Sequence, residues 1–295
     1  MPGSSCEGRC IVKQTILGKW FAREVNFGDL LAPLLLERLS GKRPINLMHS
    51  WRGKNLLKYD LRREADRQSL AQLFRRTPEP EYLTVGSVLG WCDWRADVQV
   101  VWGAGFMTPM RSLRHRPRRI HAVRGALTFD RLPADWQPEV MALGDPGLLV
   151  PDHVPLPQNT SAKIGVIAHY TQRGNPVLRC LDEDAAFKFV DIQQSVETFA
   201  HALSDCETVL SSAMHGLIAA DAYGIPNRWV NFGALPDGGT FKFRDYYSAV
   251  GNGQDDPDLI ESMADLRGAA HSAKSRTITS VQDALRKSHP FLQAS

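Results

Sequence analysis

The chain has 295 residues, of which 43% are apolar and 23% are charged, a typical composition for a globular protein. This composition excludes a disordered chain, a collagen and a small protein stapled by disulfides. Since domains usually hold about 100–200 residues, the length predicts one large or two medium domains. Lysine and arginine total 35 against 32 acidic residues, and the formal charge of +3 is too small to indicate a nucleic-acid partner.

The cysteines are five in number and lack the spacing of a disulfide framework: Cys6, Cys10, Cys92, Cys180 and Cys206. An odd number without such spacing predicts reduced thiols and a cytoplasmic protein. Cys6 and Cys10 lie close together, but no second pair of cysteines or histidines completes a metal site, so we expect none. The first ten residues lack the apolar core of a signal peptide, and the apolar run 98–110 is far short of the ~20 residues of a spanning helix. We expect no membrane span, while peripheral contact with a membrane stays open.

In the first half of the chain, a helix and several short strands are predicted. Residues 26–40 carry leucines at helical spacing and are followed by Gly41, which predicts a helix. Residues 51–80 are rich in arginine and predict a helix with a surface connection. Four apolar runs are each followed directly by glycine, as in the buried strands of a mostly parallel sheet: 82–89, 98–102, 120–124 and 140–143. This half is expected to be an open α/β domain.

The proline-rich segment 145–157 predicts a boundary between domains 1–155 and 156–295. Beyond it, predicted strands alternate with predicted helices, which indicates a parallel, right-handed, doubly wound sheet. The strands are expected at 163–169, 187–192, 208–211 and 228–231, and the helices at 195–206 and 214–223. Residues 257–287 show a helical pattern, and these C-terminal helices can pack back on the first domain.

Ligands of doubly wound sheets bind beyond the carboxyl ends of the strands, which directs attention to the strand-to-helix turns. One such turn contains Ser211, Ser212 and then His215 in the first turn of a helix. The N–H groups of a helix N-terminus suit a phosphate or carboxylate, and the imidazole can transfer a proton. An equally weighted interpretation makes Ser212 a simple N-cap and His215 a packing residue.

A second turn contains Gly103 and Gly105, which begin like a dinucleotide-binding fingerprint but lack its third glycine. We interpret these glycines as a close backbone turn that a ligand can approach. Arg124 ends the next apolar strand, where its guanidinium would face a cleft and bind a carboxylate or phosphate. The alternative for Arg124 is an internal ion pair with Asp130 or Asp145. The run of arginines and histidines at 111–121 is interpreted mainly as a solvated loop.

Three further places carry polar side chains that suit a cleft. Asn26 and Asp29 flank the start of the first predicted helix, where Asp29 can act as a base for a sugar hydroxyl or as a cap. In residues 241–247 aromatic and cationic side chains alternate, so an extended segment would place Lys242 and Arg244 on one side. His169 closes the first strand of the second half and is a weaker candidate.

Several of these motifs, taken in order, resemble the polysaccharide pyruvyl transferase family. The first half contributes Asn-Phe-Gly-Asp at 26–29, Gly-Ser at 86–87, Trp-Gly-Ala-Gly at 102–105 and Val-Arg-Gly at 123–125. The second half contributes Gly-Asp-Pro-Gly at 144–147, Ser-Ser-Ala-Met-His-Gly-Leu at 211–217 and Ala-Tyr-Gly-Ile-Pro at 222–226. The resemblance covers about residues 20–250 and is greatest to the bacterial exopolysaccharide pyruvyltransferases.

The resemblance implies two Rossmann-like doubly wound α/β domains that face each other in the GT-B arrangement, the first on the acceptor side and the second on the donor side. The implied donor is phosphoenolpyruvate, and the implied product is a cyclic pyruvate ketal plus phosphate. The acceptor is expected to be a sugar of a lipid-linked oligosaccharide. No cofactor is implied besides the donor substrate. His215 and Asp29 are then the acid and base.

The resemblance also assigns binding residues. Relatives that bind the donor through an Arg-Leu-His triplet align it with Ala213, Met214 and His215, so the arginine is absent here. Lys242 and Arg244 are the candidates that replace it. The donor-binding set is therefore Arg124, Ser211, Ser212, His215, Lys242 and Arg244. The acceptor-binding set is Asn26, Asp29, Gly105 and His169.

Two other classes share these features. A GT-B glycosyltransferase that uses a nucleotide sugar would have the same architecture and part of the basic lining, but it would release a nucleotide. A non-catalytic glycan-binding protein would keep the fold without needing groups that transfer protons. The acceptor sugar, the pair of hydroxyls bridged and the oligomeric state are not specified by the sequence.

Overall fold

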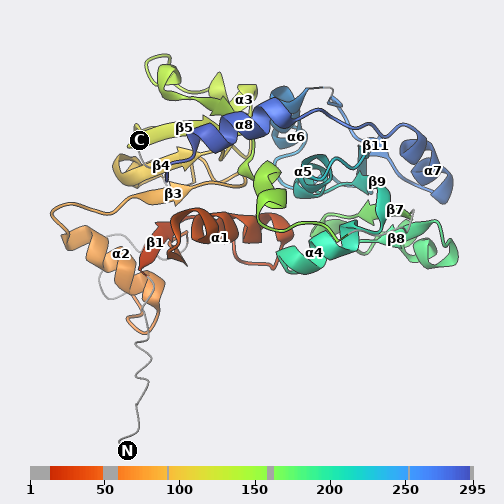
Figure 1. The fold of residues 1–295 in the computed structure, drawn as a ribbon, viewed down its shortest axis with the longest axis horizontal. Helices are drawn as coiled ribbons and strands as arrows, with labels where there is room; N and C mark the ends of the chain where they lie inside the picture. The colour runs from red at the N-terminus through yellow and green to blue at the C-terminus, as the bar shows by residue number, and fades with distance from the viewer. Residues whose placement is uncertain (1–13, 49–58, 92, 158–162, 252, 293–295) are drawn as a thin grey trace, which may run out of the picture.

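The computed structural model describes residues 14–48, 59–91, 93–157, 163–251 and 253–292, and these form two parallel β-sheets flanked by helices (Figure 1). The first sheet ends at Leu143 and the second begins at Lys163. The chain therefore has the two-domain, Rossmann-like α/β architecture that the alternation of strands and helices predicts.

Among the described residues, the first sheet has six parallel strands in the order β2-β1-β3-β4-β5-β6. They are β1 (Thr15–Gly18), β2 (Arg43–Asn46), β3 (Glu81–Leu83), β4 (Gln99–Trp102), β5 (Arg119–Val123) and β6 (Ala142–Leu143). The chain moves outward from β1 to β2, then returns to place β3 on the other side of β1. The strand order thus reverses between β1 and β3, and ligands of such sheets bind beside this point.

The second sheet repeats the same order with five described strands, β11-β10-β9-β7-β8. They are β7 (Lys163–Ile167), β8 (Phe187–Phe189), β9 (Cys206–Ser211), β10 (Asn227–Asn231) and β11 (Asp258–Leu259). Its order reverses between β7 and β9, which pair in parallel. Each half of the protein therefore has its own switch point.

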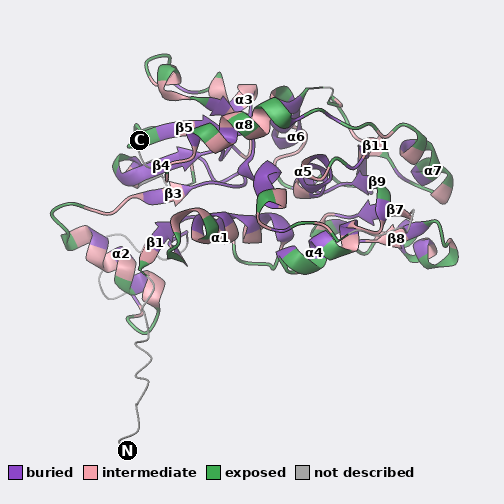
Figure 2. Ribbon diagram, in the orientation of Figure 1, coloured by how far each residue is buried: buried purple, intermediate pink, exposed green. Residues whose placement is uncertain are grey.

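The helices cover both sheets, and most strands between them are buried (Figure 2). Their bounds are α1 (Phe27–Ser40), α2 (Glu64–Phe74), α3 (Ala126–Phe129), α4 (Val196–Leu203), α5 (Met214–Ala222), α6 (Phe241–Val250), α7 (Met263–His271) and α8 (Thr279–Ser288). Helix α8 contacts β5 and β6 of the first sheet, and the indole of Trp102 donates a hydrogen bond to Ser288 at 3.3 Å. The end of the chain thus lies on the first half.

A shared apolar core joins the halves. Helix α1 buries Phe27, Leu31 and Leu35, and the ring of Phe27 stacks on that of Phe199 in α4 with 4.2 Å between centroids. The same core cluster includes Ile16 of the first sheet and Ile167 of the second. Because burial of a large apolar side chain contributes roughly 1.5–3 kcal/mol, this continuity fixes one half against the other.

Three sequence-based expectations need correction. Strands β1 and β2 were not predicted; β2 contains Pro44, which an edge strand tolerates. Residues 257–287 are not helical throughout, since they begin with β11 and are interrupted between α7 and α8. The segment 241–247 is not extended but forms α6, whose buried Phe243, Tyr246, Tyr247 and Val250 follow helical spacing.

Candidate active site

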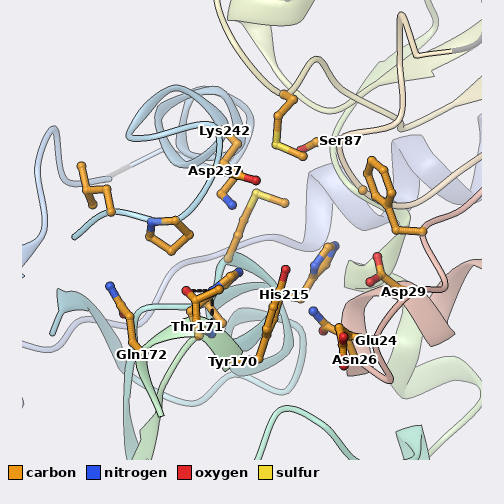
Figure 3. Close-up of a pocket in the computed structure, with 18 of the residues that line it drawn as sticks. Glu24, Asn26, Asp29, Ser87, Tyr170, Thr171, Gln172, His215, Asp237 and Lys242 are labelled. Carbon is orange, nitrogen blue, oxygen red and sulfur yellow. Dashed lines mark hydrogen bonds between the residues drawn. The ribbon is translucent and has the colours of Figure 1, made fainter. Parts of the chain in front are cut away.

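A cavity of about 780 Å³ lies between the halves, and both switch points contribute to its wall (Figure 3). The first half supplies the segment after β1 with the start of α1, and the loop after β3 that contains Gly86 and Ser87. The second half supplies the loop after β7 that begins at His169, and the start of α5 with His215. The ends of strands in both sheets therefore meet at one site, as expected for sheets of this kind.

The start of α1 provides a capped helix with a buried carboxyl. The side chain of Asn26 accepts a hydrogen bond from the N–H of Gly28 at 3.0 Å, so Asn26 is the N-cap while also lining the cavity. Asp29 follows in the first turn. Burial raises the pKa of Asp29 to about 7, and the positive charge of Lys242 opposes part of that shift. Asp29 is thus poised to hold or release a proton near neutral pH.

Gly28 allows the two halves to approach closely. A Cβ atom at position 28 would lie 2.0 Å from Nδ1 of His215, so any side chain there would displace the imidazole. A Cβ at Gly86 would lie 4.0 Å from Cε1 of the same ring. The glycine of the Asn-Phe-Gly-Asp motif is therefore explained by a histidine almost two hundred residues later in the chain.

The two serines before α5 do not face the cavity. Ser211 is fully buried, and its hydroxyl donates to the carbonyl of Ala213 at 2.8 Å. Ser212 accepts a hydrogen bond from the N–H of His169 at 2.8 Å, which ties the loop after β7 to the end of β9. Neither serine lines the cavity, so the structure does not place them where a donor would bind.

Helix α5 begins without a side-chain cap. Its N-cap is Ala213, not Ser212 as one interpretation held, and no side chain hydrogen-bonds to the first-turn N–H groups. Ala213, Met214 and His215 all line the cavity. The uncapped N–H groups and the partial positive charge of the helix end can receive an anionic group there.

Both histidines of the cavity are neutral at pH 7. Burial lowers the pKa of His215 to about 3, and the charges of Lys242 and Arg124 add to that shift. Burial and then Lys242 lower the pKa of His169 to about 4. His169 forms a hydrogen bond with the hydroxyl of Thr171 at 2.8 Å, whereas the side chain of His215 is 12% exposed and presents its ring to the cavity (Figure 3).

The two cations of α6 lie in different environments. Lys242 lines the cavity and is only 8% exposed, and burial lowers its pKa to about 8. Arg244 does not line the cavity, because a helix turns residues two apart to different sides. The guanidinium of Arg244 instead donates to the carbonyl of Asp255 at 2.6 Å and pairs with Asp256 at 3.0 Å.

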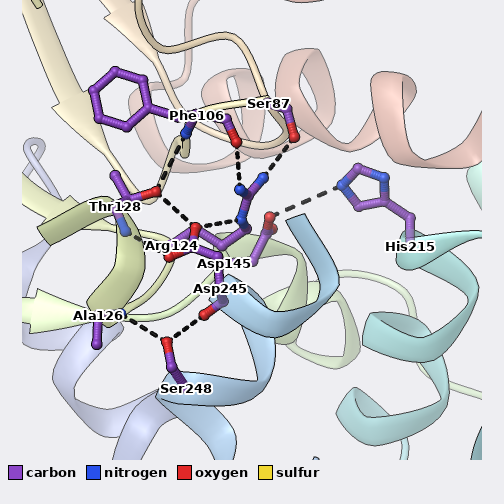
Figure 4. A network of polar contacts seen from close by, with 9 residues as sticks. All are labelled: Ser87, Phe106, Arg124, Ala126, Thr128, Asp145, His215, Asp245 and Ser248. Atoms are coloured by element: carbon purple, nitrogen blue, oxygen red, sulfur yellow. Dashed lines mark hydrogen bonds and ion pairs between the residues drawn. The ribbon is translucent and has the colours of Figure 1, made fainter. Parts of the chain in front are cut away.

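Arg124 is buried beneath the cavity rather than exposed in its wall (Figure 4). Its guanidinium donates to Asp245 of α6 at 2.8 Å, to Ser87 at 2.6 Å and to the carbonyl of Phe106 at 2.6 Å. The expected alternative of an internal ion pair therefore holds, but with Asp245 as the partner instead of Asp130 or Asp145. Since Asp245 lies three residues after Lys242, Arg124 anchors the helix that carries the cavity's cation.

Gly105 supports Arg124 rather than a ligand. A Cβ atom at position 105 would lie 2.5 Å from Cζ of Arg124, so the glycine leaves room for the guanidinium. Gly105 does not line the cavity. The acceptor role expected for it is thus not supported by its position.

Sequence reasoning missed the aromatic residues of the cavity. Phe21, Trp91 and Tyr170 follow β1, β3 and β7, and all line the wall. The rings of Phe21 and Trp91 meet edge to face at 5.4 Å, and Arg111 of the basic run lies 4.5 Å above the Trp91 ring. Their positions after strand ends were the available signal, since the same rule had identified His169.

Two features are absent from the described part of the chain: a membrane-spanning helix and a cluster of metal ligands. No described helix combines the length and apolar character needed to cross a membrane. Within the same residues, no three His, Cys, Asp or Glu side chains cluster in a way that could hold a metal ion. Cys6, Cys10 and Cys92 lie outside the described residues.

The fold and the cavity define a two-domain, Rossmann-like α/β protein with a ligand site between its halves. A family model described as Polysaccharide pyruvyl transferase matches residues 26–232, and the chain belongs to that family. The match spans the Asn26 cap, the loop after β3, the loop after β7 and the histidine turn. The chain is therefore a member of a transferase family that acts on polysaccharides.

One curated relative is the "Uncharacterized protein L143" of Acanthamoeba polyphaga mimivirus, 29% identical over 180 residues. The alignment covers 58% of this chain and 61% of that protein. The chain thus spans less than two thirds of the relative's length.

Proposed function

We propose that this protein transfers the enolpyruvyl group of phosphoenolpyruvate to two hydroxyls of a sugar, forming a cyclic pyruvate ketal and releasing phosphate. The observation that carries the proposal is the cavity, because its wall brings together Asp29, His215 and Lys242. The chain that forms this cavity belongs to the polysaccharide pyruvyl transferase family. Two Rossmann-like halves with a site between them support the GT-B arrangement.

The donor is proposed to bind on the second half. Phosphoenolpyruvate carries a carboxylate and a phosphate, so its site needs fixed cations and N–H donors. Lys242 and the uncapped start of α5 supply both, and they line the same cavity. Lys242 thereby takes the place of the arginine that family members have at the position of Ala213. A bound anion favours the charged form of Lys242, because opposite charges raise the pKa of an ammonium group.

The reaction balances with two proton-transfer groups. A proton adds to the methylene carbon of the donor, C2 becomes an oxocarbenium-like centre, and the first hydroxyl oxygen bonds to C2 as it loses its proton. The C2–O bond to phosphate then breaks, and the second hydroxyl oxygen bonds to C2 and loses its proton. One proton is consumed at the methylene, two leave the hydroxyls, and the surplus proton leaves with phosphate.

Asp29 and His215 divide these proton transfers. The pKa of Asp29, about 7, lets it hold a proton for delivery at neutral pH, whereas His215, with a pKa of about 3, is a neutral base. This reverses the order in which the two residues were first assigned as acid and base. The negative charges of the donor raise the pKa of His215, so the imidazole can hold the proton that it accepts.

The acceptor is proposed to enter past aromatic residues that both halves contribute to the cavity wall. Trp91 and Tyr170 are 42% and 37% exposed, and both line the cavity. Such rings present an apolar face with polar edges, which suits a sugar. A lipid-linked oligosaccharide in the cytoplasm is the acceptor that we propose, with the lipid outside the cavity.

The proposal is tested with the full chain, phosphoenolpyruvate and a panel of nitrophenyl glycosides and lipid-linked sugars. We expect phosphate release and an acceptor mass increased by one pyruvate less one water. Release of a nucleotide from a nucleotide sugar, with no use of phosphoenolpyruvate, would instead identify a glycosyltransferase. Sugar binding without turnover of any donor would identify a glycan-binding protein.

A further inference from the structure

Two buried polar atoms face each other beneath the cavity: Oδ2 of Asp145 and Nε2 of His215, 3.9 Å apart (Figure 4). Neither atom has a hydrogen-bond partner among the described residues. A buried polar atom without a partner costs about 1–3 kcal/mol, so two such atoms at this distance need an explanation. Hydrogen bonds between catalytic groups are often long before substrate binds and shorten in the complex.

Asp145 is held in place by its other contacts. It follows β6 and caps the 3₁₀ segment η4 (Pro146–Asp152), where Oδ1 accepts a hydrogen bond from the N–H of Gly147 at 2.8 Å. The N–H of Gly86 also donates to this carboxylate. The side chain of Asp145 therefore cannot turn away from His215 without losing these bonds.

No side chain packs against the imidazole at position 28, beside Nδ1. Because Nε2 is buried against Asp145, Nδ1 is the ring nitrogen that is left to meet a substrate. Gly28 lies beside Nδ1, where a Cβ atom would approach to 2.0 Å. His215 thus has a carboxylate facing Nε2, and beside Nδ1 it has a residue without a side chain.

We propose that Asp145 is a positioning residue that keeps the proton of His215 on Nε2, so that Nδ1 retains its lone pair and accepts the proton of an acceptor hydroxyl. As the hydroxyl oxygen bonds to C2 of the donor, its proton moves to Nδ1. The carboxylate of Asp145 then stabilises the imidazolium through the Nε2–H group. The identity of the hydroxyl rests on the proposed function, but the position of the ring proton does not.

The surrounding charges fit this arrangement at pH 7. Burial, followed by the charges of Lys242 of α6 and of Arg124 just after β5, lowers the pKa of His215 to about 3. Burial raises the pKa of Asp145 to about 6, with Asp245 adding to the rise and Arg124 opposing it. Asp29 of α1 titrates near pH 7 on the cavity side. The pair is then a neutral imidazole and a mostly ionised carboxylate, so Nε2–H can donate.

The substitution Asp145→Asn reverses the direction of the hydrogen bond between the side chain of residue 145 and Nε2 of His215. The asparagine oxygen keeps the hydrogen bond from Gly147, which places the amide NH₂ against Nε2. Nε2 must then accept, so the proton moves to Nδ1 and the base is lost. In a Ser-His-Asp triad the same replacement gives the wrong tautomer and lowers kcat about 10⁴-fold. We expect kcat to fall ~10²–10⁴-fold here, with a change of less than about threefold in the KM for phosphoenolpyruvate.

The tautomer is measured without substrate by ¹⁵N NMR of the imidazole nitrogens at pH 7, with His215→Gln identifying the signals among the nine histidines. We expect unprotonated Nδ1 in the wild type and unprotonated Nε2 in Asp145→Asn. Asp29→Asn, which removes the other nearby carboxyl, should leave the tautomer of the wild type.

A wild-type spectrum with the proton on Nδ1, or an unchanged tautomer in a folded Asp145→Asn, would overturn the proposal. If Asp145→Asn does not fold, the wild-type spectrum still decides where the proton lies. A wild type that shows protonated Nε2 but does not use phosphoenolpyruvate would support the positioning role and contradict only the proposed function.

Discussion

In the first half, the helix at the cavity follows β1 and has its N–H groups capped by Asn26, whereas in the second half it follows β9 and begins uncapped at Ala213. The capped edge carries the carboxyl of Asp29, and the uncapped edge carries His215 and receives Lys242 from α6. Two sheets with the same strand order thus present unlike chemistry to one cavity. An anionic donor fits the uncapped edge, and a hydroxyl that must lose a proton fits the space between the edges.

The chemical difference between the two edges of the cavity depends most on His215. His215→Ala should lower kcat about 10²–10⁴-fold, because it removes a proton-transfer group and no other described histidine of the cavity replaces it. His169→Ala is the matched control, since His169 lines the cavity but is occupied with Thr171. Steady-state kinetics with phosphate detection measures both. A folded His215→Ala that retains more than about a tenth of the activity would remove His215 from the reaction.

A substitution of Asp29 tests the role of the cavity edge that the first half provides. Asp29→Asn should lower kcat roughly 10²–10³-fold, because the amide cannot deliver or accept the proton. Unchanged kcat in a correctly folded Asp29→Asn would show that the first edge takes no part in proton transfer.

Asp29→Asn also has a defined effect on stability. The folded pKa of about 7 exceeds the unfolded value of 3.8, so the folded state holds an extra proton between these pH values. The contribution of Asp29 to the free energy of unfolding therefore falls as pH rises through this window. The variant should gain stability relative to the wild type, by up to about 4 kcal/mol at pH 8 and little at pH 4. Urea unfolding at both pH values measures the difference, and a pH-independent gap would contradict the raised pKa.

Arg124 joins the two edges through α6. Arg124→Lys should lower the free energy of unfolding by roughly 2–4 kcal/mol, because an ammonium cannot serve Asp245, Ser87 and the Phe106 carbonyl at once. Urea denaturation checks this against Arg244→Lys, a surface exchange expected to change stability by less than about 0.5 kcal/mol. Equal unfolding free energies for the two variants would show that the buried network does not fix α6.

Lys242 sharpens the assignment of the donor to the second edge. Lys242→Met should raise the KM for phosphoenolpyruvate about 10–100-fold, since a charge-assisted hydrogen bond contributes about 1.5–3 kcal/mol. Arg244→Met on the same helix is the control, because Arg244 pairs with Asp256 outside the cavity. An equal effect on the KM in both variants would contradict the cavity role of Lys242.

The strand-to-helix rule predicted more of the site than the charges did. His169 and His215 were identified because they follow predicted strands, and Asn26 and Asp29 because they flank the start of the first predicted helix; all four line the cavity. Arg124 follows the same rule but is buried, since its partner Asp245 is more than one hundred residues away in the sequence. No local pattern reports such a distant partner.

The wrong placement of Arg244 at the cavity has a local cause in the sequence pattern. The alternation of aromatic and basic residues at 241–244 suggested an extended segment, and only the wider spacing of Phe243, Tyr246, Tyr247 and Val250 reveals the helix. Because the segment is a helix, Lys242 and Arg244 lie on different sides of it, and only Lys242 lines the cavity. A window of seven residues was too short to distinguish the two periods.

The last prediction concerns metal and is the smallest in effect. Divalent ions such as Mg²⁺ require several oxygen ligands, and the densest acidic run of the sequence, at 182–184, includes Asp184, which pairs with Arg267 at 2.5 Å. In the cavity, the ammonium of Lys242 and the start of α5 can neutralise the donor's charges directly. We therefore expect activity to change by less than about twofold in excess EDTA. A loss above about tenfold that Mg²⁺ or Mn²⁺ restores would show that the contrast between the two edges is not enough to hold the donor.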